Sequence, residues 1–419
     1  MYILHIQHHK TLRPRPSSVC VLFVLFIAFF ASETTCAQGV DETSTALSSL
    51  TVKPEGTAQA QSTSDSGAET PWYDRIRFSG DFRTRYEGFY QANSETRNRG
   101  RFRLRLRVDT DLNDDARFHL QVASGDSGTP VSTNQSFTSF FRPKPFNLDR
   151  AYLAYNPQAA SALTLGAGKF GFPQNRTQMV FDDDLNVEGA WEQVSWNFAD
   201  GVGVNLVALQ TAVTEVKRDD DAFMLAGYGE LIVEGGRADF SVSAANYAWV
   251  NPNLIAVGQT DRVISSARTN EIIRNAVGSV VGFASGFNVI DVIAEATFQT
   301  ARSDYPVRIL VDFARNTRAF SDRNSGFWLE AGYGRPRAVH TWGATYTYGW
   351  IEQDVAPSAY VFSDMPGTNL RLHMIEASYI PKDRLSFDVT LHLTKRLVVP
   401  NDTPNDLLAR LHVAIVARF

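Results

Sequence analysis

Polar and apolar residues alternate one by one along two segments near the start of the folded region. Between 75 and 87, charged or hydroxyl-bearing residues occupy the odd positions and mostly apolar residues the even ones. Between 99 and 109, five arginines recur at every second position, separated by residues such as Phe102, Leu104 and Leu106. Successive side chains of a β-strand point to opposite faces, whereas a helix with this spacing would carry arginine on every side. Both segments are therefore predicted to be β-strands.

Further segments with the same alternation follow, so the chain contains sixteen candidate strands. Each is about as long as a tilted strand must be to cross a bilayer. The alternation is lost midway in two of them, 146–156 and 369–380. The further segments run over approximately 115–125, 146–156, 162–172, 187–199, 201–216, 222–235, 237–250, 286–300, 305–317, 325–335, 338–352, 369–380, 384–396 and 407–419.

Short turns and long loops alternate between successive candidate strands. Turn-forming residues make up the short connections, whereas the long loops run at about 126–145, 173–186, 251–285 and 353–368. A transmembrane antiparallel β-barrel requires this arrangement, with short periplasmic turns at one end and long extracellular loops at the other. The predicted fold class is therefore all-β, with about sixteen strands and both termini on the periplasmic side.

The segment 251–285 has two interpretations. Its apolar residues have a partly helical spacing, at Val263, Ile264, Ala267, Ile272, Ile273 and Ala276. This spacing favours a loop helix that folds into the pore as a constriction. The same segment could instead contribute one more hairpin, which would raise the number of strands to eighteen. We favour the loop.

The cost of placing arginine in lipid determines how the first two strands are oriented. An arginine that faces lipid near the bilayer midplane costs about 2–4 kcal/mol. Five of them would approach the whole stability of an ordinary domain, roughly 5–15 kcal/mol. We therefore expect the arginines of 99–109, here called the arginine ladder, to face an aqueous interior. The residues predicted to line the pore are Arg75, Arg77, Asp81, Arg83, Arg85, Glu87, Arg99, Arg101, Arg103, Arg105, Arg107, Arg117 and His119.

The composition and the N-terminus indicate an exported protein. The mean hydropathy of the 419 residues is −0.19 and the only long apolar run, at 19–31, is too short to span a bilayer. With the basic residues before it and a cleavage-like site after it, this run predicts a signal peptide over 1–37. The segment 38–71 is rich in Ser, Thr, Gln and Gly and is predicted to be a flexible periplasmic leader, followed by the barrel over 72–419. Both cysteines fall within the predicted signal peptide, so the barrel has no disulfide, zinc-thiolate site or cysteine nucleophile.

Several motifs resemble a bacterial putative porin family, which is similar in style to the phosphate-selective and alginate-export outer-membrane porins. These motifs are SGDFRTRYEGF (79–89), RGRFRLRLRVD (99–109), LDRAYLAY (148–155), LGAGKF (165–170), FDDDLNVEGAW (181–191) and a terminal Phe419. The resemblance implies an outer-membrane channel for passive diffusion, often assembled as a homotrimer, with Phe419 read by the barrel-insertion machinery. Because the basic residues of the first strands are all arginine, the lysine pattern of phosphate-selective relatives is missing.

We therefore expect a bacterial outer-membrane porin, embedded in lipid, through which small polar solutes pass, with anions as one candidate class. The ladder could attract anionic solutes, or it could pair with carboxylates on neighbouring strands and keep the pore hydrated. Nucleic acid is not an expected partner, since binding phosphates along a backbone does not require an apolar residue at every second position. A non-conducting barrel that acts as an adhesin or scaffold is the main alternative, and an outer-membrane hydrolase is a further one. The chain has no G-x-S-x-G, H-E-x-x-H or P-loop motif, so no catalytic residue or cofactor is predicted.

Metal sites receive little support from the sequence. Asp182, Asp183 and Asp184 could hold a hard cation such as Ca²⁺ at the pore mouth, but the glycine-centred loop of an EF-hand is absent, which favours a solvated acidic loop. The histidines have no metal-ligand spacing. His392 and His412 fall on the same face as the polar residues of their strands and are interpreted as wall residues.

Overall fold

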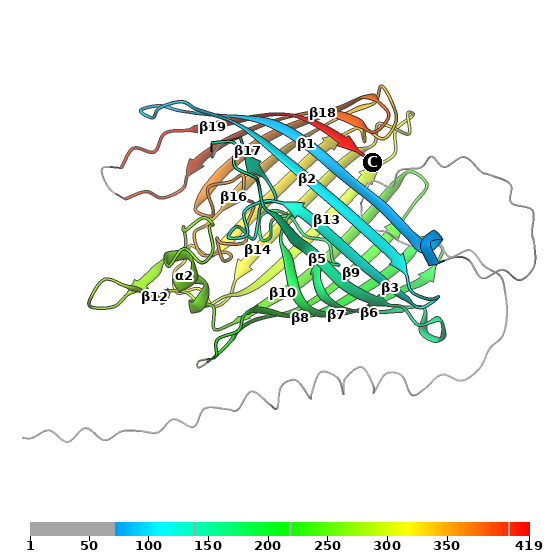
Figure 1. Ribbon diagram of the computed structural model, residues 1–419, viewed down its shortest axis with the longest axis horizontal. Coiled ribbons are helices and arrows are strands. Elements are labelled where there is room, and N and C mark those ends of the chain that lie inside the picture. Colours follow the sequence, from blue (N-terminus) through cyan, green and yellow to red (C-terminus); the bar gives the residue numbers. More distant parts are fainter. Residues whose placement is uncertain (1–71, 138–139, 218–219, 401–402) are drawn as a thin grey trace, which may run out of the picture. The chain divides into compact units, whose positions relative to one another are not determined.

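A closed antiparallel β-barrel makes up most of the chain in the computed structural model (Figure 1). The structure describes residues 72–137, 140–217, 220–400 and 403–419. The predicted signal peptide and leader lie outside the described residues. Seventeen strands share one sheet, which closes because β1 pairs with both β2 and β19. One of the seventeen is β4, which has only two residues, so sixteen full-length strands make up the barrel wall. The predicted number of strands is confirmed.

The sixteen wall strands lie within a few residues of the predicted segments. The first eight are β1 (Ile76–Gln91), β2 (Arg97–Asp111), β3 (Ala116–Ser124), β5 (Phe146–Tyr155), β6 (Leu163–Gly171), β7 (Asn186–Ala199), β8 (Val202–Thr214) and β9 (Ala222–Glu234). The second eight are β10 (Ala238–Val250), β13 (Asn288–Phe298), β14 (Val307–Asn316), β15 (Ser325–Tyr333), β16 (Trp342–Ile351), β17 (Leu370–Lys382), β18 (Leu385–Arg396) and β19 (Leu408–Arg418). The remaining elements are η2 (Trp72–Arg75), β4 (Gln135–Ser136), η3 (Gln158–Ala160), α2 (Asn253–Thr260), β11 (Ile272–Arg274) and β12 (Val280–Phe283).

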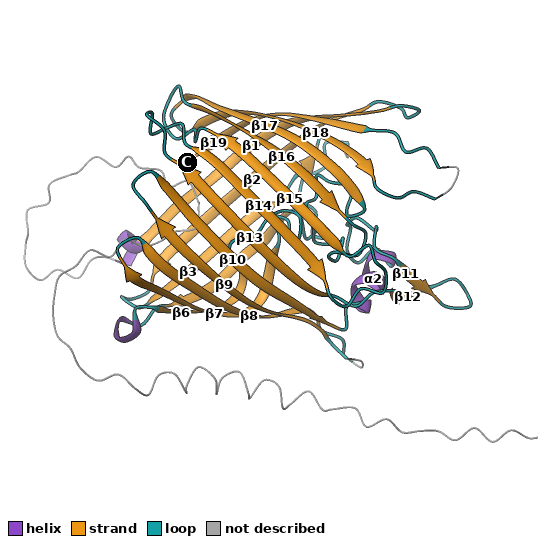
Figure 2. Ribbon diagram, turned by 180° about the vertical axis from the view of Figure 1, so that it is seen from behind, coloured by secondary structure: helices purple, strands orange, loops and turns teal. Residues whose placement is uncertain are grey.

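Short turns and long loops lie at opposite ends of the barrel, as predicted (Figure 2). Segment 251–287 contains α2 and a separate small sheet of β11 and β12, neither of which joins the wall. The alternative of eighteen strands is therefore wrong. The helix begins earlier than the apolar spacing indicated, and Ile272 and Ile273 belong to the small hairpin instead. No helix in the described part of the chain has the length and apolarity needed to cross a bilayer.

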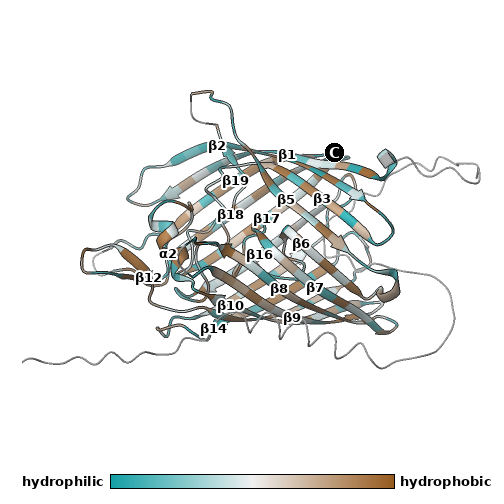
Figure 3. Ribbon diagram, turned by 60° about the horizontal axis from the view of Figure 1, so that its bottom comes forward, coloured by the Kyte–Doolittle hydropathy of each residue, from teal (hydrophilic) through white to brown (hydrophobic). Residues whose placement is uncertain are grey.

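The outer face of the wall is apolar and the inner face of its first strands is charged. Figure 3 shows hydrophobic and hydrophilic residues alternating along the strands. On β1, the even-numbered Phe78 is 76 % exposed, whereas the odd-numbered Arg85 and Glu87 are buried. The same separation holds on β19, where Val413 and Ile415 are exposed and Arg410 and His412 are buried. The period-two pattern thus divides lipid-facing from inward-facing residues, as expected for a membrane barrel.

A β-bulge explains why the alternation fails midway along β5. Val122 of β3 pairs with Leu148, and its neighbour Gln121 pairs with Arg150, so Asp149 has no partner opposite it. The extra residue turns both Asp149 and Arg150 inward, where they hydrogen-bond to Asn186. Because a bulge shifts the register by one residue, every side chain beyond it changes face.

Spin labels across this bulge provide a direct test. We expect nitroxides at 148 and 151 to report hydrocarbon and those at 149 and 150 to report water. On β2, which has no such bulge, labels at Phe102 and Leu104 should report hydrocarbon and a label at Arg103 should report water. The measurement is power-saturation electron paramagnetic resonance with oxygen and a water-soluble nickel complex as relaxation agents. Strict alternation through 148–151 would show that the bulge is absent.

Part of the inner face of β8 to β17 is apolar, although the sequence predicts an aqueous interior beside the arginine ladder. Inward side chains there pack against two loops that fold into the barrel, 172–185 and 352–369. Phe181 of the first loop contacts Tyr247 of β10 with ring centroids 4.9 Å apart, and Tyr360 of the second stacks on Trp249 at 5.5 Å. Other inward residues of this core are Leu209, Met224, Val289, Leu310 and Trp328.

The same packing explains why the alternation of polar and apolar residues is lost along 369–380, the segment that forms β17. Its pairing with β16 and β18 is regular from Leu370 to Tyr379, so the strand does not change face. Instead, Leu370, Leu372 and Met374 point inward and are buried, with Val355, Ala359 and Met365 of loop 352–369 in the same apolar core. A strand that carries apolar residues on both faces indicates lipid on one side and a packed loop on the other.

Candidate functional site

The arginine ladder lies on the inner face of β2, directly beside the charged inner face of β1. Backbone pairing places Asp81 opposite Arg105 and Arg83 opposite Arg103. Asp81 accepts hydrogen bonds from Arg103 at 2.7 Å and from Arg105 at 2.7 Å. The alternating sequence therefore brings cations and carboxylates of two strands together on one wall.

Glu87 connects the loop-end half of this wall. Its fully buried carboxylate forms ion pairs with Arg85, with Arg99 at 2.5 Å, with Arg101 at 3.4 Å and with Arg410 of β19 at 3.2 Å. One buried carboxylate among four guanidinium groups leaves the cluster with an excess of positive charge. Part of the ladder is thus paired with carboxylates of its own wall, as one of the two interpretations expected.

Loop 352–369 meets the same wall through Asp364. This carboxylate is 3.0 Å from Arg85 and 2.7 Å from Arg410. Burial alone would raise the pKa of Asp364, but the two guanidinium groups hold that pKa well below its usual value. The carboxylate is therefore ionised at neutral pH and fixes the loop to β1 and β19.

Loop 172–185 meets the ladder through Asp184. Its carboxylate lies 3.6 Å from Arg105 and 4.0 Å from Arg103, and accepts a hydrogen bond from the Thr133 hydroxyl at 3.1 Å. Thr177 of the same loop donates to Asp312 on the inner face of β14. The loop therefore reaches across the inside of the barrel, from β14 to the arginine wall.

Three half-buried inward arginines of β1, β2 and β5 have no carboxylate within 4.0 Å among the described residues. Arg83 donates to Asn134 at 2.7 Å, Arg107 to Gln121 at 3.1 Å, and Arg150 to Asn186 at 2.7 Å. All three are half-buried. A guanidinium that is hydrogen-bonded only to amides keeps its positive charge uncompensated by a direct ion pair, so these three are the groups best able to attract an anion.

The remaining predicted pore residues lie towards the turn end. Arg77 and Arg117 are exposed and share Asp111, at 2.6 and 2.9 Å. His119 lies 2.5 Å from Asp109. Arg75 does not lie on a strand, because it ends the short helix η2, and it is exposed. The structure thus groups the predicted residues between 81 and 107 on the inner face of β1 and β2 and leaves those outside this range at the turn end.

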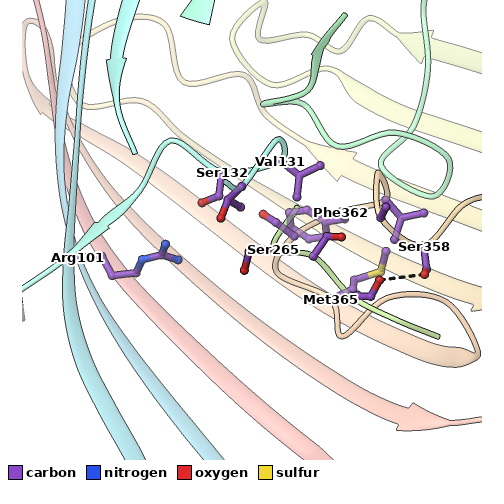
Figure 4. A pocket seen from close by; sticks show the side chains of 13 residues that line it. Arg101, Val131, Ser132, Ser265, Ser358, Phe362 and Met365 are labelled. Carbon is purple, nitrogen blue, oxygen red and sulfur yellow. Dashed lines mark hydrogen bonds between the residues drawn. The ribbon is translucent and has the colours of Figure 1, made fainter. Parts of the chain in front are cut away.

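A cavity of about 250 Å³ lies on the loop side of the ladder (Figure 4). Arg101 points from β2 towards the loop residues that form the rest of the cavity. The lining is rich in hydroxyl groups, from Thr129, Ser132, Ser265, Ser266, Ser358 and Ser363. A second cavity of about 280 Å³ also includes Arg101, together with Asn134 and Lys144. Arg101 therefore lines both cavities.

Carboxylates line the inner face opposite the ladder, nearer the turn end. Glu295 of β13 and Glu330 of β15 both bind Arg308, at 2.8 and 2.6 Å. Glu376 of β17 also points inward and is exposed. The lumen therefore has a positive wall and a partly negative one, and its electric field lies across the channel.

The carboxylates of Asp182, Asp183 and Asp184 have separate partners. Asp182 is buried and accepts hydrogen bonds from the backbone N–H of Ser363 and of Asp184. Asp183 is exposed and accepts a hydrogen bond from Gln178 at 2.6 Å. Asp184 binds the ladder, as described above. The acidic run therefore connects two loops and the wall.

Sequence reasoning missed several residues of this site. Arg150 was hidden by the bulge, and Asp364 and Arg410 lie far from the ladder along the chain. Asp364 lies beside His392 and His412, whose rings have centroids 4.8 Å apart. The alternation at 407–419 places Arg410 on the polar face of its strand, but no local pattern indicates that Asp364 reaches it.

Comparison with known proteins supports the resemblance found in the sequence. The profile of the putative porin family matches residues 89–228. The barrel is similar to OprB of Pseudomonas putida, with a TM-score of 0.53 and 12 % identity over 83 % of this chain and 95 % of that one. It is also similar to an anion-selective porin from Comamonas acidovorans, with a TM-score of 0.49 and 10 % identity over 82 % and 99 % of the two chains. None of the curated proteins compared with the chain matches it.

Proposed function

Taking this chain as a porin of the bacterial outer membrane, we propose that it is a passive channel for small polar solutes that favours anions. The observation that carries this proposal is the set of three inward cations, Arg83, Arg107 and Arg150, without a direct carboxylate partner. They lie on the inner face of β1, β2 and β5, beside the ion-paired part of the arginine wall. A positive, half-buried wall lowers the energy of an anion in a narrow passage and raises that of a cation.

The hydroxyl-rich cavity beside Arg101 supports the entry of small oxygen-rich solutes. Serine and threonine hydroxyls both donate and accept hydrogen bonds, so they can replace water around a solute. Arg101 then offers a cation at the inner end of the cavity. Small carboxylates fit this combination, and no covalent chemistry is involved in their passage.

A homotrimer is the assembly we propose. Lys169 of β6 and Glu188 of β7 point away from the apolar core and form a 2.9 Å ion pair on the outer face. Glu192 and Gln210, also on this face, are hydrogen-bonded to each other. Charged groups on a lipid face are costly, and β6 is among the shortest wall strands. Contact with another subunit would remove this patch from lipid.

Export and insertion follow the sequence features at the two ends. We infer that residues 1–37 direct export and that Phe419 is read by the insertion machinery. Phe419 directly follows β19, and its backbone carbonyl accepts a hydrogen bond from the Gly80 N–H at 2.8 Å, so the last residue belongs to the closing seam of the barrel.

A non-conducting scaffold is the second candidate. The packed apolar part of the interior favours it, because the infolded loops leave less open cross-section than an empty barrel of sixteen strands would have. Long loops at one end would then bind surface partners.

Planar-bilayer recording separates the two candidates. We expect steady open-channel steps, closure in groups of three if the barrel is trimeric, and a reversal potential in a salt gradient that indicates anion preference. Replacing Arg83, Arg107 and Arg150 together by alanine should reduce the anion-to-cation permeability ratio by roughly three- to tenfold, since three screened ionic interactions of about 0.2–0.5 kcal/mol each add up to about 0.6–1.5 kcal/mol.

Two controls define the result. The exposed, ion-paired Arg117→Ala lies at the turn end and should leave the permeability ratio unchanged. Arg103→Ala with Arg105→Ala should have a smaller effect than the triple variant, because both arginines are paired with Asp81. Absence of conductance would support the scaffold, and an unchanged ratio in the triple variant would leave the arginines with a structural role only.

A further inference from the structure

Three potential metal ligands converge on the inner wall where β18 and β19 meet loop 352–369. His392 of β18 and His412 of β19 are inward-facing diagonal neighbours, since His412 pairs with Thr390 and His392 with Arg410. Asp364 of the loop completes the group. One ligand atom from each residue lies within 4.8 Å of the others.

Three of the four imidazole nitrogens of this group lack hydrogen-bond partners although both rings are buried. His392 is 2 % exposed and His412 is 4 % exposed. Neither ring nitrogen of His392, nor Nε2 of His412, has a hydrogen-bond partner within the described part of the chain. Buried polar atoms are nearly always satisfied, so three unsatisfied nitrogens in one place indicate a missing ligand, an ion or ordered water.

We propose that Asp364, His392 and His412 bind a divalent transition-metal cation of the zinc class. Two imidazoles and one carboxylate are a donor set that such ions accept, with a fourth position left for water. Imidazole nitrogen favours Zn²⁺, Cu²⁺ or Ni²⁺ over Ca²⁺ and Mg²⁺, which prefer oxygen. The buried carboxylate of Glu87, 4.0 Å from Nε2 of His412, adds negative charge next to the site.

Nearby guanidinium groups compete with a cation for the Asp364 carboxylate and limit the affinity. Arg410 is 2.7 Å from Oδ1 of Asp364, whereas Oδ2 is the oxygen nearer to His412, at 3.8 Å from its Nδ1. Ligating carboxylates commonly keep hydrogen bonds to neighbouring groups. Arg85 is 3.0 Å from Oδ2 and must shift if that oxygen coordinates the ion. We therefore expect a site that is specific for imidazole-preferring ions and of moderate affinity.

Metal binding would fasten loop 352–369 to β18 and β19, in addition to its ion pairs with β1 and β19. This role would be separate from solute passage, because a metal held by the two histidines and Asp364 links the loop to the wall and does not need an open channel. The inference can therefore hold whether or not the barrel conducts.

Zinc titration of the purified, folded barrel in detergent tests the proposal. After removal of metal with EDTA, calorimetry should show one Zn²⁺ bound per chain, undisturbed by excess Ca²⁺. His392→Ala and His412→Ala should each weaken binding at least about tenfold. The matched control is His340→Ala, since His340 is an exposed histidine at the turn end. Co²⁺ should give a visible absorption band typical of a four-coordinate site in the wild type and the control only.

Two results would overturn the proposal: no Zn²⁺ binding by the wild type, or equal binding by the wild type and a His392→Ala, His412→Ala double variant. Heat-modifiable electrophoretic mobility verifies that each variant has formed a barrel. If a variant fails to fold, the unmutated protein still provides a test with diethyl pyrocarbonate. Zn²⁺ should protect His392 and His412 from modification and leave His340 reactive, whereas equal labelling with and without Zn²⁺ counts against the site.

Discussion

Replacing Asp364 by alanine is expected to destabilise the barrel by about 3–5 kcal/mol and to release loop 352–369. The substitution leaves Arg85 and Arg410 without their loop partner, and their side chains are only 6 % and 8 % exposed. Removing one member of a buried ion pair costs about this much. Glu87 would then be the one carboxylate left to Arg85 and Arg410, and it is already shared with Arg99 and Arg101. Urea unfolding in lipid vesicles containing EDTA measures the loss without any contribution from bound metal, and bilayer recordings should show a larger and noisier conductance.

Asp111 provides the matched control. It also binds two arginines, Arg77 and Arg117, but the side chain of Asp111 is 31 % exposed and that of Arg77 is 55 % exposed. Exposed ion pairs contribute about 0–1 kcal/mol, so Asp111→Ala should have a small effect and leave conductance unchanged. If the two variants lose equal free energy of unfolding, the ion pairs of Asp364 contribute no more than exposed ones, which would contradict the prediction.

The pH dependence of the anchor follows from the lowered pKa of Asp364. A carboxyl whose folded-state pKa lies below its unfolded value stabilises the fold at any pH above the unfolded value. This stability is lost as the pH falls from the unfolded value through the lowered one. The loop should therefore stay attached to β1 and β19 at neutral pH and be released only in strong acid. In Asp364→Ala, the part of the stability loss at low pH that comes from this carboxyl should be absent.

Trp328→Ala is expected to destabilise the barrel by about 3–5 kcal/mol, the usual cost of removing a large aromatic side chain from a packed core. Trp328 points inward from β15 and is fully buried. In an empty porin an inward side chain would face water, and its removal would cost little. The measurement is again urea unfolding in vesicles.

Glu376→Ala is the comparison for this second variant. Glu376 also points inward, from β17, but is exposed, so its loss should change stability by no more than about 0.5 kcal/mol. Similar effects of the two substitutions would contradict the apolar packing between the wall and the infolded loops.

Much of the wall could be predicted from the sequence because each strand is recorded in its own local alternation. A lipid-facing residue must be apolar whatever the rest of the chain does. Strands such as 99–109, 384–396 and 407–419 can therefore each be predicted from their own residues. The loops can also be predicted, because the alternation of polar and apolar residues stops in them. These two features are sufficient for the number of strands and the end of the barrel at which each connection lies.

The remaining features depend on contacts between distant parts of the chain. Nothing in the sequence of β5 marks Asp149 as an extra residue, because the bulge is defined only by pairing with β3. The inward apolar residues of β17 have meaning only once loop 352–369 is known to fold inside. Arg85 and Asp364 lie 279 positions apart, so their ion pair cannot be inferred from spacing. The histidines at 392 and 412 likewise meet only through the register of the last hairpin.

The two infolded loops are joined to each other inside the barrel. Asp182 N–H donates to the Tyr360 carbonyl at 2.8 Å, and Phe362 N–H donates to the Gln178 carbonyl at 3.2 Å. Together the two loops form one hydrogen-bonded unit across the inside of the barrel, which is attached to strands as far apart as β14 and β19. The aperture is consequently a joint property of two segments, and shortening either one to engineer a wider nanopore would remove the support of the other. A change in the width of the opening therefore requires that both loops be redesigned together.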